Sequence, residues 1–183
     1  MTCIVGIAEG GTVWIGGDSA GVETGSLGLV ARSDKKVFRN GNFVMGFTSS
    51  FRMGQLLAYK LSPPKRHADD DVMAYMVNDF IDAVRECLKK VGYAQKTNDE
   101  ESGGTFLVGY AGRLFHVSGD YQVGESVHGF DACGCGEKIA LGALYSTKGA
   151  EPEKRLRHAL TAAETFSAGV RSPFVIEQTD TPA

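Results

Sequence analysis

Apolar runs separated by pairs of turn-forming residues predict a chain rich in strands. In residues 1–18, two apolar runs flank Gly10–Gly11, which is typical of a β-hairpin. Asn40–Gly41 separates a second pair of runs and tolerates the positive φ angles that a two-residue hairpin turn requires. Ala111–Gly112 separates a third pair in the same way. The predicted strands lie at 4–7, 13–15, 29–30, 34–39, 43–48, 105–110, 113–117, 130–133 and 173–176.

Other segments repeat their apolar residues at intervals of three and four, which predicts helices. The longest such pattern opens at Asp69–Asp71, where carboxylates favour a helix N-terminus, and it ends near Tyr93. Its methionines, Met73 and Met76, are interpreted as core residues. Pro63–Pro64 ends the helix before it. The predicted helices lie at about 51–61, 69–93, 137–145 and 151–166.

The order of these elements predicts an α+β fold. Strands come first, then two helices, more strands, two more helices and a final strand, which suggests two packed sheets with helices outside them. The 183 residues are long enough for a full-sized core and are interpreted as one domain, 1–183. Residues 19–28, 94–103 and 118–125 are predicted as loops or turns, and 177–183 as a flexible polar tail.

Composition narrows the function classes. The formal net charge of −3 gives no reason to expect nucleic acid or an anionic membrane as a partner. No uncharged apolar run approaches the roughly 20 residues of a membrane helix. The N-terminus lacks a basic segment, and Glu9 and Asp18 interrupt its apolar stretch, so no signal peptide is expected. Four unevenly spaced cysteines favour a reducing cytoplasm over a disulfide framework.

Thr2 is the first candidate for chemistry. A threonine hydroxyl needs a base to become a nucleophile, and removal of Met1 would free the α-amine of Thr2 itself. An α-amine has a pKa of about 7.7–8.0, which suits a general base at neutral pH. Met1 is expected to be removed, because the residue that follows it, threonine, is small. Asp18 follows the predicted hairpin and supplies a carboxylate.

A series of short motifs in a fixed order resembles the proteasome β-subunit family, including its compact HslV-like members. The resemblance covers nearly the whole chain and is most specific in its first third. The motifs are Thr2-Cys3-Ile4-Val5-Gly6-Ile7, Gly16-Gly17-Asp18-Ser19-Ala20, Lys35-Lys36-Val37-Phe38, Val44-Met45-Gly46-Phe47, Gly134-Cys135-Gly136 and Glu164-Thr165-Phe166-Ser167-Ala168-Gly169.

The resemblance implies an N-terminal nucleophile hydrolase with a four-layer αββα sandwich. Thr2 would attack a peptide carbonyl while its own amine takes the hydroxyl proton. Lys36 would lower the pKa of the amine and the hydroxyl, and Asp18 would hold Lys36. Lys36 is preferred over Lys35 because the family lysine directly precedes the apolar pair. Gly46 matches the glycine whose backbone N–H forms the oxyanion hole.

The same resemblance assigns supporting and substrate-binding residues. Cys135, Glu164 and Ser167 would support the amine by hydrogen bonds, although the family usually has serine at the first position and aspartate at the second. A thiol is a weaker donor than a hydroxyl, and glutamate is one methylene longer. The residues implied to flank an apolar substrate pocket are Val22, Val44 and Thr48.

The implied partners are those of a ring-shaped peptidase. They are a peptide or an unfolded protein as substrate, further copies of this chain in a homo-oligomeric ring, and an ATP-driven unfoldase as a candidate partner. No cofactor is implied. His128, Cys133 and Cys135 lack a fourth metal ligand at suitable spacing, so no metal site is predicted.

Two alternatives remain open. The chain could be a non-catalytic homologue with a structural or ring-forming role, since a retained Met1 would leave the Thr2 nitrogen in a peptide bond. It could also be an amidase of the same superfamily. That reading requires removal of both Met1 and Thr2, so that Cys3 becomes the nucleophile.

Overall fold

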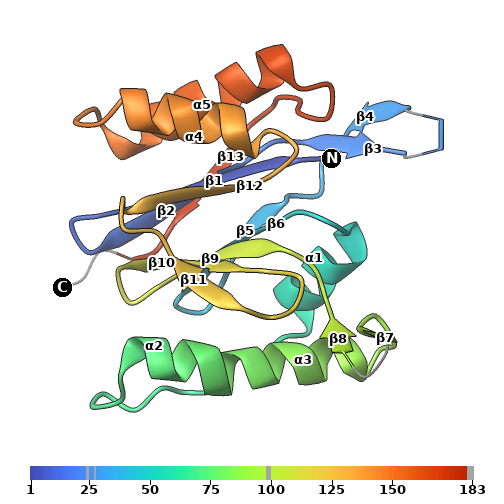
Figure 1. The fold of residues 1–183 in the computed structure, drawn as a ribbon, viewed down its shortest axis with the longest axis vertical. Coiled ribbons are helices and arrows are strands. Elements are labelled where there is room, and N and C mark those ends of the chain that lie inside the picture. The colour runs from blue at the N-terminus through green and yellow to red at the C-terminus, as the bar shows by residue number, and fades with distance from the viewer. Residues whose placement is uncertain (24, 27, 98–99, 181–183) are drawn as a thin grey trace.

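Four layers stack in the order helices, sheet, sheet, helices (Figure 1). The computed structural model describes residues 1–23, 25–26, 28–97 and 100–180. The predicted α+β class and the two antiparallel sheets flanked by helices are confirmed. Within the described residues, no helix is both long and apolar enough to cross a membrane.

Every strand pairing in the two central sheets is antiparallel. The first sheet has the order β12 (Phe130–Gly134), β1 (Cys3–Glu9), β2 (Thr12–Gly17) and β13 (Val175–Gln178). The second has the order β11 (Val123–Glu125), β10 (Arg113–Val117), β9 (Phe106–Tyr110), β6 (Phe43–Phe47) and β5 (Val37–Asn40). Two small hairpins consist of β3 (Ala20–Val22) with β4 (Leu29–Ala31) and β7 (Gln95–Thr97) with β8 (Glu100–Ser102).

The helices cover the outer faces of the sheets. α4 (Glu137–Ser146) and α5 (Pro152–Phe166) lie on the first sheet. α1 (Phe51–Tyr59) and one continuous helical rod lie on the second. The rod consists of α2 (Val72–Tyr75), a π-helical turn η1 (Met76–Phe80) and α3 (Ile81–Lys89). Ser50 and Asp71 cap the two N-termini by accepting backbone N–H bonds from Arg52 and Ala74.

Apolar residues fill the three spaces between the layers. The space between the sheets contains Ile4, Val13, Ile15, Val37, Val44, Leu107, Leu114 and Cys133. Both faces of each sheet are therefore covered, and the strand ends are where polar side chains can reach one another. β1 begins opposite the ends of β2 and β12, through the pairs Ile4–Gly17 and Cys3–Gly134.

The structure differs from the sequence prediction mainly in short elements. β3, β7, β8 and β11 lie in segments predicted as loops or turns. The tail predicted from Glu177 is wrong for its first residues, because β13 extends to Gln178. Thr179 is buried and its hydroxyl accepts a bond from Val13 N at 3.0 Å. Residues 181–183 of that predicted tail lie outside the described residues.

Candidate active site

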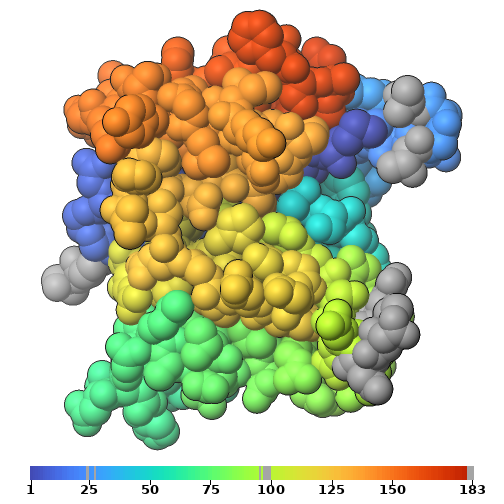
Figure 2. All heavy atoms as spheres, in the orientation of Figure 1, coloured from blue at the N-terminus to red at the C-terminus, as the bar shows by residue number. Residues whose placement is uncertain are grey.

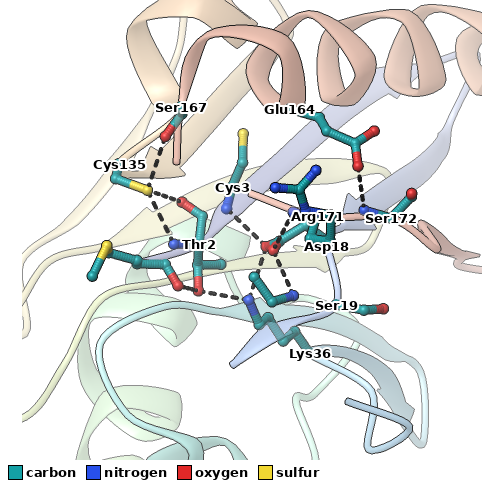
Figure 3. Close-up of polar contacts among 12 residues, drawn as sticks. Thr2, Cys3, Asp18, Ser19, Lys36, Cys135, Glu164, Ser167, Arg171 and Ser172 are labelled. Atoms are coloured by element: carbon teal, nitrogen blue, oxygen red, sulfur yellow. Dashed lines mark hydrogen bonds and ion pairs between the residues drawn. The ribbon is translucent and has the colours of Figure 1, made fainter. Parts of the chain in front are cut away.

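Thr2 lies directly before β1 and is 5% exposed. Its Oγ1 accepts a hydrogen bond of 2.9 Å from Lys36 Nζ. Lys36 directly precedes β5, the edge strand of the second sheet. This bond therefore connects the start of β1, in the first sheet, with the start of β5 (Figure 3). In Figure 2 the N-terminal segment, in dark blue, lies between the orange and red helix layer and the light-blue β3–β4 hairpin.

The Asp18 carboxylate is fully buried and accepts four hydrogen bonds. Lys36 Nζ and Cys3 N each donate to Oδ1 at 2.9 Å. Ala20 N donates to Oδ2 at 2.8 Å and Arg171 N at 3.2 Å. Three of the donors are backbone N–H groups, and their bonds to a carboxylate are stronger than bonds between neutral groups. Asp18 therefore supplies a fixed negative charge next to Lys36.

Lys36 combines burial with two acceptors. Burial lowers the pKa of Lys36 below its ordinary value, and the negative charge of Asp18 opposes that shift. The ammonium group contacts both Asp18 and Thr2 Oγ1. A cation in this position stabilises negative charge that develops on the threonine oxygen.

A second group of contacts surrounds the Thr2 backbone nitrogen. Thr2 N donates to Cys135 Sγ at 3.2 Å, and Cys135 Sγ lies 3.4 Å from Thr2 O and 3.3 Å from Ser167 Oγ. Cys135 follows β12, and Ser167 is the C-terminal cap of α5. Figure 3 shows the sulfur pointing at both polar atoms of the Thr2 backbone. Cys135 and Ser167 are thus brought to the nitrogen of Thr2.

Met1 is still attached to Thr2 in this structure. The Thr2 nitrogen is therefore an amide, which has no basic lone pair, and Thr2 Oγ1 also donates to the Met1 carbonyl oxygen. Met1 and Cys135 both lie against Gly169, because a Cβ added to Gly169 would collide with both residues. The chemistry of an N-terminal nucleophile requires this peptide bond to be cut first.

Glu164 is not brought to Thr2. Its Oε1 accepts a hydrogen bond of 2.8 Å from Ser172 N, and Figure 3 shows its side chain directed away from the Thr2 nitrogen. The prediction that Glu164 supports the amine is therefore wrong for this geometry. The glutamate instead ties the end of α5 to the segment that leads into β13.

Gly46 and Val44 lie between the two sheets instead of facing Thr2. Gly46 pairs with Val37 on one side and Leu107 on the other, so its backbone belongs to the sheet ladder. A Cβ on Gly46 would lie 2.6 Å from Ile4 Cγ2, which explains the glycine by close packing. Val44 is 0% exposed in the same layer. The geometry contradicts an oxyanion role for Gly46 and a pocket role for Val44.

Thr48 and Val22 have different surroundings. Thr48 follows β6 and lies near the site: a Cβ on Gly134 would meet Thr2 O on one side and lie 3.3 Å from Thr48 Oγ1 on the other. Gly134 has a φ of 100°, a conformation that favours glycine. Val22 ends β3 and is half-buried.

A pocket that the sequence prediction missed lies beside Lys36. It has a volume of about 400 Å³, and we call it the aromatic pocket. Phe51 lines it, and Lys36 Nζ lies 5.7 Å from the centre of the Phe51 ring. Its lining residues come from the β4–β5 connection, β5, β6 and α1: Ser33, Asp34, Lys35, Phe38, Phe47, Phe51, Gly54, Gln55, Ala58 and Tyr59.

The remaining cysteines are unsuited to catalysis or metal binding. Cys3 is fully buried, and burial raises the pKa of its thiol to about 12. Burial also raises the pKa of Cys133. A buried, protonated thiol is a poor nucleophile as long as Met1 and Thr2 remain attached. Within the described ranges, no group of three or more His, Cys, Asp or Glu side chains could hold a metal ion.

Comparison with known proteins gives solved structures only, since no family model and no curated protein matches the chain. BPH from Thiobacillus denitrificans is 23% identical over 99% of both chains, with a TM-score of 0.80. The same protein in complex with Epoxomicin is 22% identical over the full length of both chains, with a TM-score of 0.79. Eukaryotic HslV from Trypanosoma brucei is 22% identical over 97% of this chain and 98% of its own, with a TM-score of 0.68. The chain therefore has the fold of the HslV-like N-terminal nucleophile hydrolases.

Proposed function

We propose that the chain is a threonine-type peptidase subunit of a proteasome-like protease, with Thr2 as N-terminal nucleophile after removal of Met1. The observation that carries this proposal is the contact of one buried lysine with two groups. Lys36 Nζ lies 2.9 Å from Thr2 Oγ1 and 2.9 Å from Asp18 Oδ1. A buried ion pair is costly to maintain, and here its cation is directed at a hydroxyl.

The proposed reaction proceeds in two steps. Thr2 Oγ1 attacks the peptide carbonyl, and its proton passes to the free α-amine of Thr2. The carbonyl carbon–nitrogen bond breaks, the amine returns the proton to the leaving peptide, and an ester remains on Thr2. Water, deprotonated by the same amine, then hydrolyses the ester. Cys135 Sγ, 3.2 Å from the Thr2 nitrogen, would orient the amine together with Ser167.

Ser49 is our candidate for the oxyanion donor in place of Gly46. Its φ of 71° marks a left-handed turn directly after Thr48. Across the part of the chain that the structure describes, the Ser49 N–H has no hydrogen-bond partner, whereas its hydroxyl accepts a bond from Thr105 N at 3.1 Å. A free N–H next to the site can bind the negative oxygen that forms during attack.

The proposal extends to assembly and location. A peptidase of broad specificity must be kept from folded proteins, so we propose a homo-oligomeric ring that encloses the sites, peptides or unfolded proteins as substrates, and an ATP-driven unfoldase as a candidate partner. The solved complex of Thiobacillus denitrificans BPH with Epoxomicin is compatible with ligand binding in this fold. Four free cysteines agree with a reducing cytoplasm.

A second candidate function is a non-catalytic, ring-forming subunit. It is favoured by the position of Glu164, because the amine would lack a carboxylate partner on that side. In that case the Met1–Thr2 bond would persist and Lys36 would be a structural residue.

The test begins with the intact mass of the purified chain, which should lack one methionine. Thr2→Ala should then eliminate cleavage of short fluorogenic peptides, whereas Thr2→Ser, which keeps a hydroxyl, should retain it in part. A homogeneous product with Met1 attached, or unchanged turnover by Thr2→Ala, would exclude the proposed nucleophile. Oligomer size, measured for every variant, separates loss of chemistry from loss of assembly.

A further inference from the structure

A second pocket lies at the far end of β5 from Lys36. Lys36 directly precedes β5, whereas Asn40, the last residue of β5, lines this pocket. The pocket has a volume of about 440 Å³, and we call it the turn pocket. Its lining comes from the β5–β6 turn and the start of β6 (40–43), from the connection between α1 and α2 (63–66) and from Tyr110 at the end of β9. The turn pocket and the candidate active site therefore lie at opposite ends of one strand.

We propose that the turn pocket binds a small anionic ligand that carries a flat ring. The phosphate or carboxylate of the ligand pairs with Arg66 and Lys65, and its ring lies against Tyr110. This inference goes beyond the proposed peptidase function and does not depend on it. Among the described residues, none that lines the turn pocket is hydrogen-bonded to Thr2 or Lys36.

The turn pocket carries two cations whose charge is not matched by a carboxylate. Lys65 and Arg66 line it, and none of its lining residues is acidic. Within the described ranges, neither cation forms an ion pair. The carboxylate of Asp70 instead accepts a bond of 3.1 Å from His67 N, and that of Asp71 caps α2. An anion that enters the pocket therefore meets two unmatched positive charges.

Arg66 is held by one nitrogen of its guanidinium, which leaves the other two for a ligand. Nη1 donates to the backbone oxygens of His67 at 3.1 Å, Ala68 at 3.2 Å and Asp70. Nε is buried and has no hydrogen-bond partner in the part of the chain that the structure describes, and Nη2 also has none there. These two nitrogens form the edge of an arginine that contacts two oxygens of a carboxylate or phosphate. Such an oxygen would also give the buried Nε–H the acceptor that it lacks.

Rings line the turn pocket beside these cations. The Tyr110 and Phe43 rings are stacked, with centres 4.2 Å apart and planes at 8°, and the Phe43 ring is stacked on that of Phe80 with centres 5.2 Å apart. Pro63 and Pro64 contribute two further rings to the lining. A flat ring packs favourably on aromatic surface of this kind. The volume of about 440 Å³ lies within the range of small-molecule sites.

Both sides of the turn pocket are tied in place. Asn40 Nδ2 donates to Leu57 O at 3.1 Å and to Leu61 O at 2.9 Å, which joins the β5–β6 turn to the last part of α1 and the residues after it. Tyr75 Oη donates to Pro64 O at 2.6 Å, which joins the α1–α2 connection to α2. Because a preformed pocket loses little conformational entropy on binding, a small ligand with few contacts can be held there.

The experiment measures binding to the full chain by isothermal titration calorimetry, with probes that separate the anion from the ring. Adenosine monophosphate combines a phosphate with a ring, and N-acetylphenylalanine combines a carboxylate with a ring. Adenosine and N-acetylphenylalanine amide lack the anion, whereas inorganic phosphate and acetate lack the ring. At least one ring-bearing anion should bind with a Kd of about 1 mM or lower, and its controls at least about tenfold more weakly. Binding of the phosphate probe, the carboxylate probe or both supports the inference and identifies the anion.

Variants of the two cations then place the probe in the turn pocket. Arg66→Gln should raise the Kd by at least about tenfold, equivalent to ~1.4 kcal/mol, because it removes the charged two-nitrogen edge. Arg66→Lys keeps the charge without that edge, so its Kd should lie between those of Arg66→Gln and the wild type. Lys65→Gln should raise the Kd by about threefold, equivalent to ~0.7 kcal/mol. Since Lys65 is exposed, this variant tests the pocket even if Arg66→Gln fails to fold.

Arg157→Gln is the matched control. It removes the same charge from an exposed pair with Glu153 on α5 and should leave the Kd unchanged. The inference is overturned if neither ring-bearing anion binds at millimolar concentration, or if each anion binds no better than its uncharged control. An unchanged Kd in Lys65→Gln and in every folded Arg66 variant also overturns it, because the probe would then bind elsewhere. These outcomes leave the peptidase proposal untouched, since the readout is binding and not peptide cleavage. The melting temperature shows which variants are folded.

Discussion

The two sides of Thr2 are built in different ways. On the hydroxyl side, Lys36 and Asp18 have side chains that are 1% and 0% exposed, and they form a charged pair of 2.9 Å. On the nitrogen side, Cys135 is exposed. Its sulfur makes uncharged contacts of 3.2–3.4 Å with the Thr2 backbone and with Ser167. An ion pair shielded from water acts far more strongly than an exposed thiol contact.

This difference between the two sides predicts which side of the site tolerates amino-acid substitutions. Lys36 and Asp18 sit at strand ends whose positions are set by sheet pairing, and the buried charges require one another. Cys135 and Ser167 meet where a strand ends and a helix ends, and Cys135 is exposed. We expect substitutions on the hydroxyl side to abolish function and those on the nitrogen side to adjust it.

The largest effect is expected from Lys36→Ala. Without the cation, the threonine oxygen loses its electrostatic support, and kcat/KM should fall by about 10²–10³-fold, the range for removing one group that stabilises developing charge. Lys35→Ala is the control, because Lys35 pairs with Glu177 at the surface and should change kcat/KM only slightly. The reverse order would place the essential lysine one residue earlier.

Asp18→Asn should act first on stability. The substitution keeps the size of the side chain but leaves Lys36 buried without its counter-ion, which should lower the free energy of unfolding by about 3–5 kcal/mol. Urea unfolding measures this change. Asp180→Asn removes an exposed partner of Arg39 and should have no measurable effect. Equal stability of the two variants would mean that burial does not distinguish the pairs.

Cys135→Ser tests the nitrogen side. A hydroxyl is a stronger donor and acceptor than a thiol, so the free amine should be better oriented. We expect kcat/KM to rise by about fivefold, equivalent to ~1 kcal/mol for one improved hydrogen bond. Cys135→Ala should lower kcat/KM by a similar factor. A serine variant with the activity of the alanine variant would show that this contact has no influence on the amine.

The smallest effect is expected from Glu164→Gln. Because Glu164 Oε1 accepts from Ser172 N and does not contact Thr2, an amide oxygen at the same place should preserve the bond. The value of kcat/KM should stay within about twofold of the wild type, as for any removed contact worth less than ~0.5 kcal/mol. A loss comparable to that of Lys36→Ala would place the carboxylate in the catalytic machinery.

The layered fold could be predicted because the order of strands and helices is clear in the hydrophobic pattern. The Lys36–Thr2 contact joins two sheets, so periodicity alone could not predict it; the motif resemblance supplied that pairing. The backbone donors to Asp18 could not be predicted either. The identity of residue 171 gives no indication that its backbone N–H donates to Asp18.

The errors in the predicted site have physical causes. All five residues of β6 are buried, so its sequence lacks the alternation that would separate the face between the sheets from the face under the helices. Gly46 and Val44 were therefore placed by motif alone. The aromatic pocket escaped prediction because its walls combine β5, β6 and α1, and apolar residues at those positions are equally typical of a core.

The contact between Arg171 N and Asp18 has a consequence for biosynthesis. β13 pairs with the end of β2, and the Arg171 N–H reaches the carboxylate that holds Lys36. Thr2, Asp18 and Lys36 are therefore synthesised long before Arg171, which donates the last hydrogen bond to the Asp18 carboxylate. The nascent chain carries an unfinished site through most of its translation. The Thr2 hydroxyl therefore reaches its final surroundings only after Arg171 has been synthesised, near the end of the chain.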